Sequence, residues 1–171
     1  MKIDNFGRPD WDSYFMDMAY FITIRSIDPR TKHGCIIVDD KHRIVSTGYN
    51  GPVRGIDDSK VPLEPEEYKK YAYMEHSERN AIFSAGRSVE NCTVYVTGIP
   101  CIDCARAMFQ SGIKRIVMGK IGSNCVPLSV ANVVYEMAEL AGVEMIDYQG
   151  EPLACFNHMF KYLATKGLEK K

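Results

Sequence analysis

Residues 92–117 read CTVYVTGIPCIDCARAMFQSGIKRIV. The apolar, β-branched run at 92–97 predicts a strand, and the run at 114–118 predicts a second strand. The segment at 102–111 between them predicts a helix. Strands that alternate with helices are typical of a layered α/β fold with parallel strands.

The flanking sequence extends this pattern in both directions. Before it, the segment CIIVDDKHRIVSTGY predicts two short strands joined by a tight turn at Asp39, so the expected sheet is mixed. An apolar face formed by Trp11, Phe15, Met18 and Ile22 predicts an N-terminal helix capped by Asp10 and ended by Asp28-Pro29. The segment at 50–73 shows no periodicity and predicts a long loop. Further helices are expected at 77–86, 128–141 and 153–164, with a strand at 143–147.

The 171 residues suit one domain, which we expect to span 1–171. Within it we expect an N-terminal helix at 10–26, a central core at 74–118 and C-terminal helices within 128–164. The composition is 46% hydrophobic and 25% charged, as in an ordinary globular protein.

The net charge and hydropathy of the chain exclude some classes of binding partner. The net charge of −1 gives no basic surplus for holding a long nucleic acid by its phosphates. No apolar run approaches the roughly 18 residues of a membrane helix, and the first residues have no secretory core. We therefore expect a cytoplasmic protein that binds neither membranes nor long nucleic acids.

Two short motifs carry the chemistry. The first is His76-Ser77-Glu78, and the second, 22 residues after Glu78, is the PCIDC segment that contains Cys101 and Cys104. Each lies where a loop is expected to meet a helix, and helix N-termini stabilise thiolates. One histidine and two cysteines give zinc three protein ligands and leave one position for water, as in a catalytic site. Glu78 can then move protons to and from that water.

Other interpretations of these motifs remain open. A CxxC can be a redox pair, and His76 and Glu78 can be a packed histidine and a helix-start charge. A structural zinc site needs a fourth ligand, for which the candidates are Cys35, His33, His42 and Cys125. Cys35 and Cys92 lie in apolar runs and are expected in the core.

The two motifs together resemble the signature of the zinc-dependent nucleotide deaminases, H-x-E followed by P-C-x-x-C. The resemblance is strongest to the deoxycytidylate (dCMP) deaminases. It rests on TKHGCIIVDDKHRIVSTGYNGPVRG at 31–55, MEHSERNAIFSAGR at 74–87 and TVYVTGIPCIDCARAMFQSGIKRIV at 93–117. The chain departs from the family pattern at His33, Cys35 and Ser77, and the segment after Val117 does not align.

This resemblance implies a three-layer α/β/α fold with a five-stranded mixed sheet, and hydrolysis of dCMP to dUMP and ammonia. It implies Zn²⁺ on His76, Cys101 and Cys104, with Glu78 as the catalytic proton carrier. Asn50 is expected to hold the sugar hydroxyl, although Asn-Gly is also a strong turn signal.

The resemblance further implies regulation by nucleoside triphosphates. In this family dCTP activates and dTTP inhibits, with Mg²⁺ on the triphosphate, and the assembly is often a hexamer. The positions expected to form the regulatory site are Lys32, Gly51, Arg54, Gly55 and Arg87.

Two rival functions remain at this point. One keeps the zinc chemistry but changes the substrate to cytidine, dCTP, a tRNA adenosine or a riboflavin-pathway pyrimidine. The other is a zinc protein that binds nucleotides without catalysis.

Overall fold

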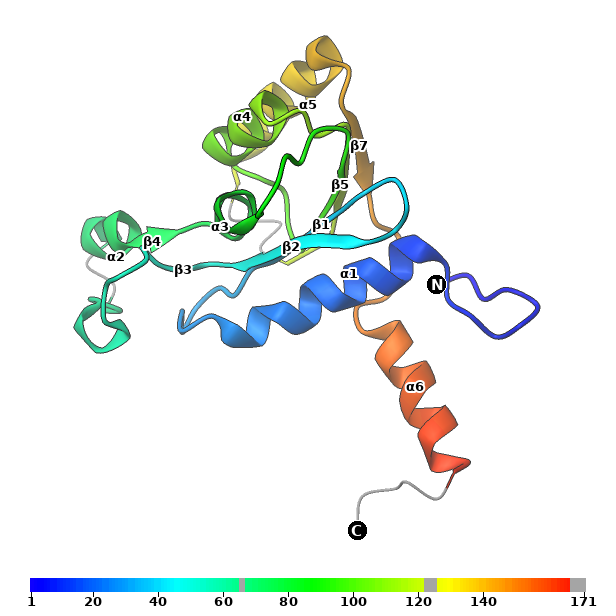
Figure 1. Ribbon diagram of the computed structural model, residues 1–171. Coiled ribbons are helices and arrows are strands. Elements are labelled where there is room, and N and C mark those ends of the chain that lie inside the picture. The colour runs from blue at the N-terminus through cyan, green and yellow to red at the C-terminus, as the bar shows by residue number, and fades with distance from the viewer. Residues whose placement is uncertain (65–66, 122–125, 167–171) are drawn as a thin grey trace.

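The computed structural model describes residues 1–64, 67–121 and 126–166, and its centre is a five-stranded sheet (Figure 1). The strand order is β2-β1-β5-β6-β7. β1 pairs with β2 and β5 in antiparallel fashion, whereas β5, β6 and β7 are parallel. This confirms the predicted mixed sheet. The strands are β1 (Gly34–Val38), β2 (Ile44–Tyr49), β5 (Thr93–Val96), β6 (Arg115–Met118) and β7 (Glu144–Asp147).

Helices cover both faces of this sheet, which confirms the three-layer α/β/α architecture. Ile36 and Tyr95 face α1 (Trp11–Ile22) in one buried cluster. The other face packs against α3 (Ser77–Ser84), α4 (Ile102–Gln110) and α5 (Leu128–Ala141).

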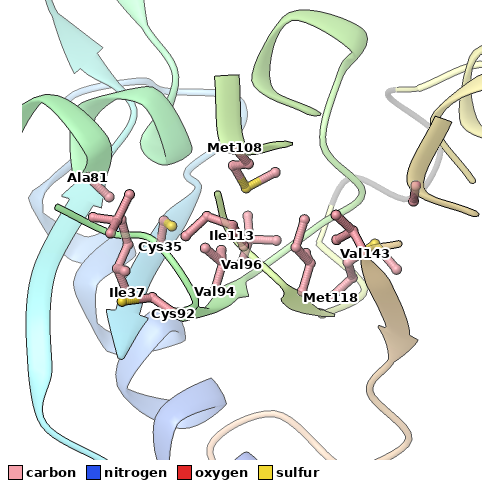
Figure 2. Close-up of a cluster of buried hydrophobic side chains, with 13 residues drawn as sticks. Cys35, Ile37, Ala81, Cys92, Val94, Val96, Met108, Ile113, Met118 and Val143 are labelled. Atoms are coloured by element: carbon pink, nitrogen blue, oxygen red, sulfur yellow. The ribbon is translucent and has the colours of Figure 1, made fainter. Parts of the chain in front are cut away.

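The second face carries the larger apolar cluster, which Figure 2 shows in close-up. Cys35 and Ile37 of β1 meet Val94 and Val96 of β5, and Met108 of α4 closes the cluster from above. Cys92 belongs to the same cluster, so the predicted core positions of Cys35 and Cys92 are confirmed.

The N-terminal helix is shorter than predicted. Asp10 caps it as expected, because its carboxylate accepts the backbone N–H of Ser13 at 2.9 Å. The α-helix ends at Ile22, however, and one 3-10 turn (η1, Thr23–Arg25) follows before the chain becomes extended at Ser26. At this change from α-helix to 3-10 turn the Thr23 hydroxyl donates to the carbonyl oxygen of Tyr20 at 2.7 Å, a bond that competes with the regular helical pattern.

The prediction of an irregular loop at 50–73 was wrong in part. The short strands β3 (Gly51–Pro52) and β4 (Met74–Glu75) pair with each other, η2 covers Asp58–Lys60, and α2 covers Glu67–Tyr73. Lys70 of α2 forms a buried ion pair with Asp28, which the local sequence does not encode. Tertiary anchoring therefore accompanies a helix that has no apolar periodicity of its own.

The last helix, α6 (Ala154–Ala164), lies against α1 and runs away from the sheet (Figure 1). The Asp17 carboxylate of α1 accepts the backbone N–H groups of Leu153 and Cys155 at 2.7 and 2.5 Å. No helix in the described ranges is long and apolar enough to cross a bilayer.

Candidate metal centre and catalytic cavity

Two helix N-termini bring the predicted metal ligands together. His76 is the N-cap of α3, Cys101 is the N-cap of α4, and Cys104 lies in the first turn of α4. The His76 Nδ1 atom is 3.5 Å from the Cys101 Sγ atom and 3.4 Å from the Cys104 Sγ atom. Within the described part of the chain these three residues form a group able to hold a metal ion.

The distances between these nitrogen and sulfur atoms suit zinc. A tetrahedral Zn²⁺ with bonds of about 2.3 Å to sulfur and about 2.0 Å to nitrogen keeps those ligand atoms about 3.5 Å apart. The His76–cysteine distances match this value without any rearrangement. The donor set of one imidazole and two thiols is also one that zinc prefers.

Hydrogen bonds couple the ionisation of the three groups. A hydrogen bond from Cys104, together with one from His76, lowers the pKa of Cys101 to about 4. The hydrogen bond to Cys101 raises the pKa of His76 to about 9, and hydrogen bonding with Cys101 raises that of Cys104. At neutral pH the Cys101 thiolate therefore lies beside a protonated His76, and metal binding would release the protons of His76 and Cys104.

None of the three described candidates for a further ligand belongs to the ligand group. Cys35 is fully buried in the core, and His42 stacks on Trp11 with ring centroids 4.3 Å apart. The His33 ring lines the same cavity as His76, but it is outside the ligand group and its Nδ1 atom contacts Thr97. Cys125 lies outside the described residues. Among the described residues, the centre thus groups three possible protein ligands, and three is the number typical of a catalytic zinc site.

Glu78 lies beside this centre on the first turn of α3 and is only 6% exposed. The Ser77 hydroxyl donates to its Oε2 atom at 2.8 Å. A side-chain hydrogen bond and the negative charge of Glu78 both contribute, after Cys101 and burial, to the raised pKa of Cys104. A carboxylate therefore faces the metal centre from within the protein.

The metal centre opens into a cavity of about 330 Å³. Its lining includes His76, Glu78 and Cys101 together with Asn50, His33 and Lys70. A volume near the lower end of the small-molecule range suits a compact ligand of low molecular mass.

Asn50 lines this cavity, and its side chain is hydrogen-bonded to the backbone of the segment before β1. Its Oδ1 atom accepts the backbone N–H of His33 at 2.6 Å, and its Nδ2 atom donates to the Thr31 carbonyl oxygen at 2.9 Å. The Oδ1 atom retains a second lone pair that can accept from a ligand. The side chain is thereby held in a fixed orientation at the cavity wall.

Sequence reasoning missed two residues of this wall, Asp28 and Lys70. They are both buried, and the Lys70 Nζ atom is 2.7 Å from Asp28 Oδ2. The two residues are separated by 42 positions and belong to segments without a periodic pattern. No signal in the sequence pairs them.

The predicted regulatory positions are only partly brought together. Gly51, Arg54 and Gly55 line a hollow of about 500 Å³ beside the end of β2, which Arg25 also lines. Arg87 instead pairs with Asp39 at the other end of the β1–β2 hairpin. The Lys32 ammonium donates to the Ser26 carbonyl oxygen and does not line the hollow.

The sheet order and the centre at two helix N-termini define a metal-binding α/β domain. Residues 9–120 match the family described as the cytidine and deoxycytidylate deaminase zinc-binding region. The chain belongs to this family.

Relatives named as deoxycytidylate deaminases support the assignment. The human deoxycytidylate deaminase is 37% identical over 113 residues, which cover 63% of this chain and 64% of the human protein. A probable deoxycytidylate deaminase of Caenorhabditis elegans is 42% identical over 105 residues, 60% of this chain and 53% of that protein. The chain matches less than two thirds of the length of these relatives.

A solved structure extends the comparison of the fold. The dCMP deaminase of the cyanophage S-TIM5, in complex with dCMP and dUMP, superposes with a TM-score of 0.66 and 22% identity. The match covers 82% of this chain and 98% of the phage protein. At this identity the likeness establishes a shared fold.

Proposed function

We propose that this protein hydrolyses dCMP to dUMP and ammonia. The observation that carries the proposal is the buried Glu78 carboxylate beside the His76–Cys101–Cys104 centre in one small cavity. The names of the human and Caenorhabditis elegans relatives support dCMP as the substrate.

His76, Cys101 and Cys104 are the residues that hold Zn²⁺. The ion supplies a Lewis acid that makes a water molecule a better nucleophile at neutral pH. In the net reaction the water oxygen joins C4 of the cytosine ring, the C4–N4 bond breaks, and ammonia leaves.

Glu78 moves the protons of this reaction. Because the Ser77 hydroxyl holds Oε2, we assign the transfer to Oε1. Oε1 takes the proton of the water, delivers it to N3 of the ring, and then passes a proton to the departing amine. We assign to the free lone pair of Asn50 Oδ1 a hydrogen bond from a sugar hydroxyl.

The first experiment measures turnover of dCMP by zinc-loaded protein, with cytidine, dCTP and cytosine beside it. We expect Glu78→Gln to lower kcat on dCMP by roughly 10²- to 10⁴-fold, the contribution of one acid–base group. Zinc per chain and the circular dichroism spectrum should stay unchanged, since Glu78 is outside the ligand set.

Undiminished turnover in Glu78→Gln would show that the assigned proton carrier is wrong. Turnover of another tested substrate in place of dCMP would identify a zinc deaminase of different specificity. Stoichiometric zinc without any turnover would favour the non-catalytic nucleotide-binding protein. A Cys101–Cys104 disulfide without zinc would favour a redox pair.

We also propose that dCTP activates and dTTP inhibits the enzyme, each with Mg²⁺, at the hollow lined by Gly51, Arg54 and Gly55. The support is chemical, because exposed guanidinium groups and backbone N–H groups suit polyphosphate. Arg25 adds a second guanidinium to the same hollow.

The test adds dTTP or dCTP, each with Mg²⁺, to the active protein and records the rate and the oligomeric state, which we expect to be a hexamer. We expect dTTP to lower the rate, and Arg54→Ala to abolish this inhibition without changing the rate in its absence. Arg87→Ala is the matched control and should remain inhibited, because Arg87 does not line the hollow. Rates that respond to neither triphosphate would exclude this regulation.

A further inference from the structure

The cavity wall contains a buried lysine, Lys70. The stability of the fold does not by itself explain why it is buried there. Lys70 is 6% exposed, although its neighbours Tyr71 and Tyr73 in the short helix α2 are 64% and 39% exposed. Lysine is almost never buried unless it is paired, and a buried ion pair gains little net free energy after desolvation. A cation placed in the lining of a ligand cavity therefore points to recognition of a ligand.

Asp28 fixes this cation in place. Its Oδ1 and Oδ2 atoms are 2.8 and 2.7 Å from the Lys70 Nζ atom, and Oδ1 also accepts the backbone N–H groups of Arg30 and Thr31. Although burial opposes the effect, hydrogen bonds from Lys70 and from these backbone groups lower the pKa of Asp28. An ionised carboxylate thus holds the ammonium against the cavity.

The Lys70 ammonium can still donate a hydrogen bond to a ligand. An ammonium group has three N–H donors, and the two Asp28 oxygens occupy at most two of them. The remaining donor belongs to a side chain that lines the cavity.

A second cation lines the same cavity. The exposed Arg30 guanidinium forms no ion pair with any residue in the ranges that the structure describes. Asp28, Arg30 and Lys70 together carry one net positive charge, and two donor-rich cations suit an anion with several oxygens. A phosphate monoester is such an anion.

We propose that Lys70 binds the 5′-phosphate of the substrate and makes the cavity specific for nucleoside monophosphates over nucleosides, with Asp28 as its positioning residue. The nature of the ligand rests on the function proposed above. The assignment of Lys70 rests on its burial, its ion pair and its place in the lining.

The experiment measures binding by calorimetry, so that it does not depend on turnover. The zinc-loaded Glu78→Gln protein is titrated with dCMP and with deoxycytidine, and then again with Lys70→Met added. We expect Lys70→Met to weaken dCMP binding by roughly 10- to 100-fold, the range for one charged hydrogen bond, and deoxycytidine binding by less than about threefold.

Two controls separate recognition from folding. Lys60→Met removes the same charge from the exposed η2 segment and should change neither affinity. The double variant Asp28→Asn/Lys70→Met removes both charges, so no buried carboxylate is left unpaired. It should also lose the preference for dCMP.

An equal loss of affinity for dCMP and deoxycytidine would overturn the proposal, because that result indicates a purely structural lysine. An unchanged preference for dCMP would overturn it as well. If the wild-type protein binds dCMP through Lys70 but does not deaminate it, the proposed function fails and this inference stands.

Discussion

At the scale of single residues, the Thr97 hydroxyl contacts the His33 ring, which lines the cavity. The Thr97 Oγ1 atom accepts the backbone N–H of Gly34 at 3.1 Å and lies 3.2 Å from His33 Nδ1. The hydroxyl has one proton, and Nδ1 is the acceptor within reach, so we infer that His33 carries its own proton on Nε2. Burial lowers the pKa of His33, although the charge of Glu78 opposes this, and the ring is therefore neutral at pH 7.

Replacing Thr97 tests this arrangement. Thr97→Val keeps the side-chain shape but leaves the Gly34 N–H without its acceptor in a buried position. We expect the free energy of unfolding to fall by about 1–3 kcal/mol, as measured by chemical denaturation. Thr93→Val at the start of β5, which ends one residue before Thr97, is the control. Equal stability changes in the two variants would show that the Thr97 hydroxyl has no special role.

At the scale of the elements, one glycine sets the position of the helix that carries Glu78. A Cβ atom at Gly48 of β2 would lie 2.1 Å from the Ser77 carbonyl oxygen and 2.5 Å from the Ala81 nitrogen. The backbone of α3 therefore rests directly on β2, and Asn80 adds a hydrogen bond to the Tyr49 carbonyl oxygen at 2.8 Å. This contact fixes both the metal ligand and the proton carrier relative to the sheet.

We expect Gly48→Ala to displace α3, because the added methyl group meets backbone that has no rotamer to change. Overpacking of this kind costs about 1–3 kcal/mol of stability, and the shift should also weaken zinc binding. The measurements are zinc per chain after dialysis and the free energy of unfolding. Gly86→Ala, beyond the end of α3, meets no atom within 4 Å and should change neither quantity.

At the scale of the whole molecule, the cavity is assembled from distant segments. Asp28 and His33 precede β1 and Asn50 follows β2, whereas Lys70 belongs to α2 and Glu78 to α3. The helix N-termini of α3 and α4 meet because both helices cover the same face of the sheet. A site of this kind depends on the order of the strands.

The sequence by itself determined the alternating strands and helices and the metal-binding motifs. These features depend on local patterns: apolar periodicity, helix-start positions and the spacing of His76, Cys101 and Cys104. The mixed sheet and the buried Cys35 and Cys92 also followed from these patterns. The end of α1 was misplaced, because a 3-10 turn at Thr23–Arg25 replaces the last predicted turn of α-helix.

Only the tertiary structure decided which charged residues lie inside. Lys70 and Asp28 resemble other surface charges in the sequence, and so does Arg87, which pairs with Asp39 instead of lining the expected regulatory hollow. The physical reason is that the free energy of a buried charge depends on the partner facing it. That partner lies 42 positions away for Lys70, and the buried Asp39 meets the exposed Arg87 across 48 positions, beyond the reach of any local pattern.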